Sequence, residues 1–180
     1  DHLLSRPADA AYVATVLAAW ASRYVSRTAI LDTSSAAVDG DGVVVVDESG
    51  AGTLTQSIRA GRHVVTADEP LGIGDDLGPT PYDLLLAALG SCTSMTLRLY
   101  ADRKGWPLER VAVRLAHQRV HADDCADPET RPCTVDHIDR SVTLDGPLTD
   151  DQRTALLGIA ERCPVHRTLT GEIRVSTLLA

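Results

Sequence analysis

Phenylalanine is absent from this 180-residue sequence, and all aromatic residues together make up only 3%. Positive charge is also scarce, because 17 lysines and arginines stand against 25 aspartates and glutamates, which gives a formal net charge of −8. Proteins that bind nucleic acid or anionic membranes need a basic surface, and nucleic-acid binders usually add aromatic side chains. The composition therefore argues against both partners and predicts a core of leucine, valine, isoleucine and alanine.

Long apolar runs are missing as well. No uninterrupted run of 18 apolar residues occurs, and the first 25 residues lack the basic start and apolar centre of a signal peptide. The four cysteines are too widely spaced to suggest the disulfide framework of a small secreted domain. We therefore expect a cytoplasmic protein whose thiols are buried or reactive, with one ordinary domain and a short appendage.

Several motifs of well-defined chemistry do not occur. The loop glycines Gly72 and Gly74 lack the spacing of a dinucleotide-binding loop and precede two acids, so no cofactor is expected. Cys125 and Cys133 have histidines nearby and raise the question of a metal site, but no Cys-x-x-Cys accompanies them. An exposed acidic loop is the simpler interpretation of that segment, and no metal is predicted.

Residues 81–104 carry a strong helix pattern. A threonine that can cap the helix precedes Pro81, which suits the first turn, and an acid follows at Asp83. Apolar residues then recur at three- and four-residue steps until a basic turn, a glycine and a proline end the pattern. The pattern predicts a helix of about six turns, with Cys92 on its apolar face.

A second cysteine ends a second predicted helix. Thr149 and Gln152 have capping-box spacing, an apolar face continues to Cys163, and Pro164 ends the run. Cys92 and Cys163 are 71 positions apart, so only the tertiary structure could bring them together. A buried thiol on an apolar helix face is more often inert packing than a reactive group.

Strand patterns fill most of the remaining sequence. Residues 43–46, 54–58 and 63–67 predict a three-stranded antiparallel meander. Strands are also expected at 111–121, near 138–144 and at 172–178. This order predicts an α+β fold, in which antiparallel sheets pack against two helices, one of them long and central.

The two cysteine segments together resemble a known family. Pro81-Tyr-Asp-Leu-Leu-Leu-Ala-Ala-Leu-Gly-Ser-Cys92 and Cys163-Pro-Val-His-Arg-Thr-Leu169 are similar to the OsmC/Ohr family of thiol-dependent peroxidases, and closest to its OsmC-like branch. The resemblance implies an OsmC-like fold assembled as an intertwined homodimer. It also implies an organic hydroperoxide substrate and a dithiol reductant.

The resemblance assigns roles to individual residues. The cysteine that matches Cys92 attacks the peroxide, and the one that matches Cys163 resolves the sulfenic acid. An arginine from the N-terminal sheet activates the thiol in the family, and Arg59 and Arg62 are both candidates here. The family glutamate that holds this arginine is replaced by tyrosine at position 82, and Glu69 could substitute for it.

Residues 1–25 predict an amphipathic helix, residues 26–41 a linker, and residues 42–180 the OsmC-like domain. The first five residues resemble the C-terminal end of an α/β-hydrolase domain, where a histidine such as His2 follows the last strand. The serine motif Gly-x-Ser-x-Gly is absent, so His2 has no hydrolytic partner here. The alternative to a peroxidase is a non-catalytic binding or dimerisation module of a hydrolase fusion protein.

Overall fold

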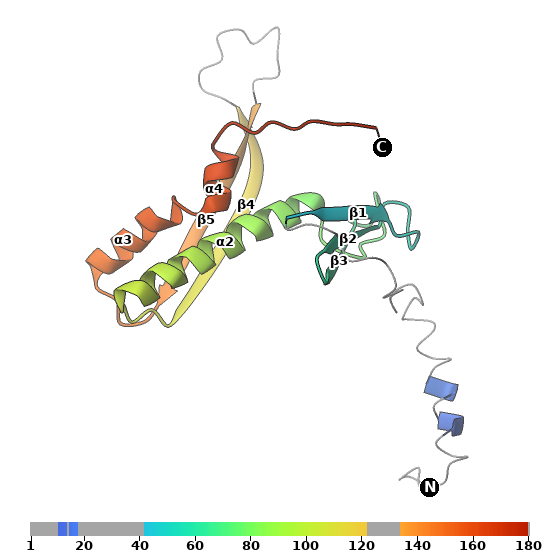
Figure 1. Ribbon diagram of the computed structural model, residues 1–180, viewed down its shortest axis with the longest axis horizontal. Coiled ribbons are helices and arrows are strands. Elements are labelled where there is room, and N and C mark those ends of the chain that lie inside the picture. Colours follow the sequence, from blue (N-terminus) through green and yellow to red (C-terminus); the bar gives the residue numbers. More distant parts are fainter. Residues whose placement is uncertain (1–10, 14, 18–41, 122–133, 180) are drawn as a thin grey trace. The chain divides into compact units, whose positions relative to one another are not determined.

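The computed structural model describes residues 11–13, 15–17, 42–121 and 134–179. It divides into two compact units, Asp1–Thr80 and Pro81–Ala180, which are described separately. The elements are β1 (Val44–Glu48), β2 (Gln56–Ala60), β3 (His63–Ala67), α2 (Pro81–Lys104), β4 (Arg110–His121), β5 (Thr134–Asp145), α3 (Asp150–Ala160) and α4 (Pro164–Leu169) (Figure 1). The α+β class expected from the sequence is confirmed.

The first unit contains the predicted meander. Strands β1, β2 and β3 form one antiparallel sheet in sequence order, with Val45 opposite Arg59 and Ile58 opposite Val65. A tight turn joins β2 to β3, and Gly61 occupies it with a φ of 57°. Glycine adopts this left-handed conformation without the steric cost of a Cβ atom, which explains the sharp return of the chain.

The segment after β3 is held by one buried carboxylate. Asp68 is 2% exposed and accepts hydrogen bonds from the Thr55 hydroxyl and from the backbone N–H groups of Glu69, Asp75 and Leu77. Burial raises the pKa of Asp68, but the four hydrogen bonds act against it and hold the pKa below its usual value. The loop that follows β3 is therefore organised around this side chain.

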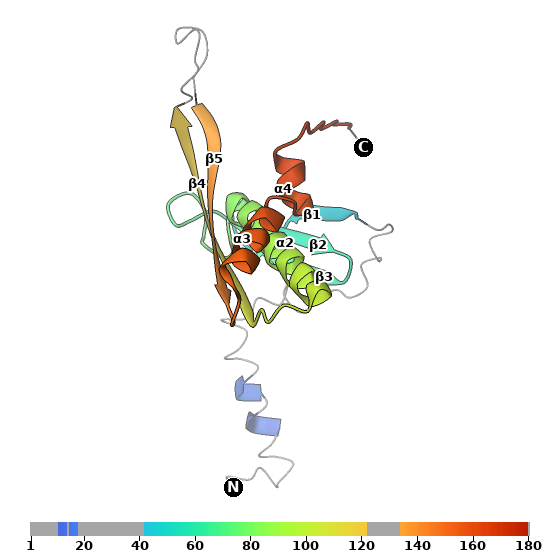
Figure 2. The same cartoon turned by 90° about the vertical axis from the view of Figure 1, so that its left-hand side faces the viewer.

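The second unit is built on a long hairpin. Strands β4 and β5 pair antiparallel along their whole length, from Arg110 opposite Asp145 to His121 opposite Thr134. Helices α2 and α3 lie side by side against one face of this hairpin (Figure 2). Alternate β5 residues therefore point toward the helices, as expected for a half-buried strand.

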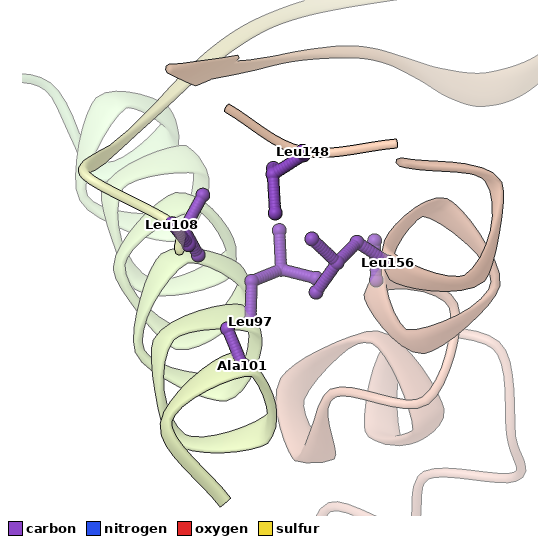
Figure 3. Packing of buried hydrophobic residues seen from close by; sticks show 6 residues of the cluster. Leu97, Ala101, Leu108, Leu148 and Leu156 are labelled. Atoms are coloured by element: carbon purple, nitrogen blue, oxygen red, sulfur yellow. The ribbon is translucent and has the colours of Figure 1, made fainter. Parts of the chain in front are cut away.

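The core of this unit lies between α2, α3 and the turns that flank the hairpin (Figure 3). Leu97 of α2 and Leu156 of α3 are completely buried against each other's helix. The cluster consists of Leu97, Ala101, Leu108, Leu148, Leu156 and Ala160. As the composition predicted, it is aliphatic, and tyrosine and tryptophan side chains pack only at its edge.

Helix α3 begins as the sequence predicted. The Thr149 side chain accepts from the Gln152 N–H, and the Gln152 side chain accepts from the Thr149 N–H. Arg153 then donates to the carbonyls of Leu144 and Gly146, which fixes the start of α3 to the end of β5. These contacts set the direction in which α3 runs toward Cys163.

Two expectations about secondary structure were wrong. Pro164 does not simply end a helix: it is the first residue of α4, which the sequence analysis did not predict. Residues 172–179 do not form the expected strand, and Ile173, Val175 and Leu178 are exposed. A strand needs a neighbour for its backbone hydrogen bonds, and none of the described strands pairs with this segment.

Helix α2 is long and apolar enough to span a membrane when judged by length and composition alone, with a mean hydropathy of 1.3. The central helix of a globular fold passes the same test. In this chain α2 packs on β4, α3 and α4, and it contributes Leu97 and Ala101 to the core. The packing accounts for its apolar composition.

Parts of the N-terminal prediction lie outside the described residues. The structure describes helical turns at residues 11–13 and 15–17, with the Thr15 hydroxyl donating to the Ala11 carbonyl. His2, the linker at 26–41, Cys125 and Cys133 are not among the described residues. The hydrolase resemblance and the three-part domain division remain predictions.

Candidate active site

The fold brings Cys92 and Cys163 together. Cys92 lies midway along α2, and its Sγ accepts from the Val165 N–H at 3.5 Å. Cys163 caps the N-terminus of α4, and its Sγ accepts from the His166 N–H at 3.3 Å. Both thiols are free rather than joined by a disulfide, and Cys92 is one of the groups that lower the pKa of Cys163.

The start of α4 explains why both sulfurs meet there. Pro164 has no N–H group, so the first free backbone donors of the helix belong to Val165 and His166. Each of these donors points at one sulfur. A Cys-Pro pair at a helix start therefore places two unpaired N–H groups where two thiols can accept them.

The two cysteines differ in their access to solvent. Cys163 is completely buried, whereas Cys92 is half-buried. A small molecule can therefore reach Cys92 more directly than Cys163. The roles that the family resemblance assigns to them remain predictions.

A guanidinium that the sequence analysis did not identify lies beside the thiols. Arg140 of β5 is about one-tenth exposed, and its Nη1 donates to Thr93 Oγ1 at 3.1 Å and to the Ala160 carbonyl at 3.2 Å. Its Nη2 donates to Glu161 Oε1 at 2.8 Å. Thr93 Oγ1 in turn lies 3.5 Å from the Sγ atom of Cys163.

One signal in the sequence could have revealed Arg140. It precedes Val142 and Leu144 at two-residue steps, so it lies on the apolar, helix-facing side of its strand. A charged residue in such a position is buried only if it is paired, and here Glu161 pairs with it.

These contacts act on the protonation of Cys163. Burial is the largest single effect and raises the pKa of its thiol. Hydrogen bonds with Thr93, the His166 N–H and Cys92, together with the charge of Arg140, act in the opposite direction. The pKa of Cys163 is consequently held below its usual value, so that a larger fraction is thiolate at neutral pH.

The arginines predicted from the family resemblance lie in the other unit. Arg59 of β2 forms an ion pair with Asp47 of β1 at 2.6 Å, and Arg62 is exposed in the turn after β2. Glu69 is half-buried in the loop held by Asp68. The proposed activation of Cys92 by Arg59 or Arg62, with Glu69 as their partner, remains a prediction.

Tyr82, which replaces the family glutamate, has a defined set of neighbours. Its ring stacks on His117 with 4.5 Å between centroids, and His117 Nε2 lies 2.9 Å from Asp136 Oδ1. Arg119 also donates to Asp136. The bond with His117 is the main cause that lowers the pKa of Asp136, burial raises it, and Arg119 lowers it further. The carboxylate in the network around Tyr82, near the start of α2, is therefore that of Asp136 on β5.

A cleft of about 400 Å³ adjoins the network around the thiols. Its lining residues come from α2, β5, the end of α3 and α4, and include Leu89, Ile138, Arg140, Glu161 and His166. Among the described residues, no three histidine, cysteine, aspartate or glutamate side chains are grouped closely enough to hold a metal ion.

An α+β fold with two adjacent free thiols, one half-buried and one completely buried, defines a dithiol protein of the OsmC-like class. The sequence model described as "OsmC-like protein" matches residues 74–177, and the chain belongs to this family. The family resemblance stated from the cysteine segments is thereby confirmed. No curated protein matches the sequence.

Solved structures share the fold at low sequence identity. The OsmC-like protein from Mycoplasma pneumoniae is 17% identical with a TM-score of 0.55, covering 74% of this chain and 90% of that one. A Psychrobacter arcticus protein described as a putative osmotic stress induced and detoxification response protein is 19% identical with a TM-score of 0.56, covering 72% and 89%. An organic hydroperoxide resistance protein OsmC from Legionella pneumophila is 18% identical with a TM-score of 0.52, covering 72% and 88%.

Proposed function

We propose that this protein is a thiol-dependent peroxidase that reduces organic hydroperoxides. The observation that carries the proposal is the pair of free thiols at the start of α4, with Cys92 half-buried and Cys163 completely buried. Family membership and a structural neighbour named as an organic hydroperoxide resistance protein support the same chemistry.

The reaction proceeds in two steps. The Cys92 thiolate attacks the terminal oxygen of R–O–O–H, so that an S–O bond forms, the O–O bond breaks and the leaving alkoxide takes a proton to become the alcohol. The Cys163 thiolate then attacks the Cys92 sulfenic sulfur, an S–S bond forms, and hydroxide leaves and is protonated to water. A dithiol reductant returns the disulfide to two thiols and is itself oxidised to a disulfide.

The direct test supplies the protein with cumene hydroperoxide and dithiothreitol. We expect catalytic loss of peroxide, with formation of cumyl alcohol, and a Cys92–Cys163 disulfide in mass spectra of protein oxidised without reductant. Two controls accompany this test. Hydrogen peroxide replaces cumene hydroperoxide in one, and an inert protein without thiols replaces this protein in the other. If peroxide is lost no faster than with dithiothreitol alone, the proposal is contradicted. The alternative function, a non-catalytic binding or dimerisation module, would then be favoured.

The proposed assembly is a cytoplasmic homodimer. Its support is the apolar surface that a single chain leaves open: Met95 and Leu99 lie exposed one turn apart on α2, and the segment at 172–179 has exposed apolar side chains without a strand partner. A second copy could cover both surfaces. Sedimentation equilibrium should therefore give a mass of twice 19.2 kDa, and a concentration-independent mass of one chain would refute the dimer.

A further inference from the structure

Thr93 links a charged side chain to the buried thiol. It is completely buried on the stripe of α2 that also contributes Leu97 and Ala101 to the core. Its hydroxyl oxygen lies 2.8 Å from the Leu89 carbonyl, 3.1 Å from Arg140 Nη1 and 3.5 Å from Cys163 Sγ. One oxygen atom therefore joins the guanidinium to the sulfur.

The single proton of Thr93 can serve only one acceptor at a time. When Cys163 is a thiol, its S–H can donate to Thr93 Oγ1 while the hydroxyl donates to the Leu89 carbonyl. When Cys163 is ionised, the hydroxyl can rotate and donate to the sulfur instead. In both states Arg140 Nη1 donates to the same oxygen, so its positive charge polarises the hydroxyl toward the thiolate.

We propose that Thr93 and Arg140 form an activating site for the resolving cysteine, in which the Thr93 hydroxyl carries the charge of Arg140 to the Cys163 thiolate. Thr93 touches the reacting sulfur and is catalytic, whereas Arg140 acts through Thr93 and is a positioning residue. The inference rests on the proposed peroxidase function and deepens it, because it assigns the second step of the reaction to named groups.

Other contacts hold Arg140 in place. Glu161 binds its Nη2, and the second Glu161 oxygen lies 3.3 Å from His166 Nε2. The Ala160 carbonyl accepts from Nη1. Among the described residues, the charged and titratable groups of this network are Cys92 on α2, Arg140 on β5, Glu161 after α3 and His166 on α4, whereas Arg162 and Arg167 are exposed. Of these four groups Arg140 is the permanent cation, so replacing Arg140 should act mainly on the Cys163 thiolate.

The first measurement titrates the thiolate of Cys163 without peroxide. Cys92, Cys125 and Cys133 are replaced by serine, so that thiolate absorbance in the ultraviolet reports Cys163 alone. In this background Thr93→Val and Arg140→Gln should each move the ionisation to higher pH, because a donor or a cation that favours the charged form is lost. Thr93→Ser keeps the hydroxyl and should restore the original titration.

The second measurement follows resolution in protein with all four cysteines. After one equivalent of cumene hydroperoxide, Thr93→Val and Arg140→Gln should still form the Cys92 sulfenic acid. They should then form the disulfide about tenfold more slowly, because less of Cys163 is thiolate. Dimedone, which labels sulfenic acid, should therefore trap more Cys92 in these two variants than in the wild type or Thr93→Ser.

Arg153→Gln is the matched control, because Arg153 also donates to backbone carbonyls but lies at the opposite end of α3. In the Arg153→Gln variant, the pH at which Cys163 ionises should not change. If folded Thr93→Val ionises Cys163 at the same pH as the protein with Thr93, the inference is overturned. The comparison of Thr93→Val with Thr93→Ser is sufficient for this test if Arg140→Gln fails to fold. A shifted titration in a protein that does not reduce peroxide would refute the proposed function while leaving the activating site in place.

Discussion

Replacing Cys92 by serine is expected to abolish peroxide turnover, with a loss of at least about a thousandfold, because a serine hydroxyl cannot replace the thiolate nucleophile. Cys163→Ser should behave differently. It should still consume one equivalent of cumene hydroperoxide per chain in the absence of reductant, and stop at the Cys92 sulfenic acid. Peroxide consumption and the mass of the dimedone adduct distinguish the two variants.

The double variant Cys125→Ser, Cys133→Ser is the control for this experiment, because it removes two thiols to which the proposed reaction gives no role. It should turn over cumene hydroperoxide at the wild-type rate. Equal activity of Cys92→Ser and the wild type would show that the reaction does not depend on this sulfur. A burst from Cys92→Ser but not from Cys163→Ser would reverse the two roles.

Truncation of Leu156 to alanine should lower the free energy of unfolding by about 3 kcal/mol, because it removes a fully buried side chain and leaves a cavity beside Leu97. Its neighbour Leu157 is 51% exposed on the same helix, and Leu157→Ala should cost less than about 1 kcal/mol. Urea unfolding under reducing conditions, followed by circular dichroism, measures both changes.

Truncation of Leu156 should also affect the site around the two thiols. Helix α3 carries the Ala160 carbonyl and ends at its C-cap residue Glu161, both of which bind Arg140, and Cys163 follows two residues later. A loosened α3 should therefore slow disulfide formation as well as reduce stability. Equal losses of stability in Leu156→Ala and Leu157→Ala would contradict the packing shown in Figure 3.

Several elements were predictable because their signals are local. The start of α2 at Pro81 and the capping box of Thr149 and Gln152 depend on residues within one turn of each other. The meander and β4 followed from alternation over a few residues. The ambiguous case was Pro164, since proline both follows helix ends and begins helices.

The strand expected at 172–178 failed for a different reason. Its alternation of apolar and polar residues is a real strand pattern, but the pattern contains no information about which strand would pair with it. Backbone pairing is a property of two segments. None of the described strands pairs with this segment, and the Val175 and Leu178 side chains are therefore exposed.

The sequence by itself determined the family, the aliphatic composition of the core and the helix that carries Cys92, because these depend on short motifs and on periodicity. Only the tertiary structure decided that Cys163 meets Cys92 at the start of α4 and that Arg140 reaches the buried thiol through Thr93. The physical reason is distance along the chain: Thr93, Arg140 and Cys163 belong to three different elements, and their contacts form when α2, β5 and the segment between α3 and α4 pack together.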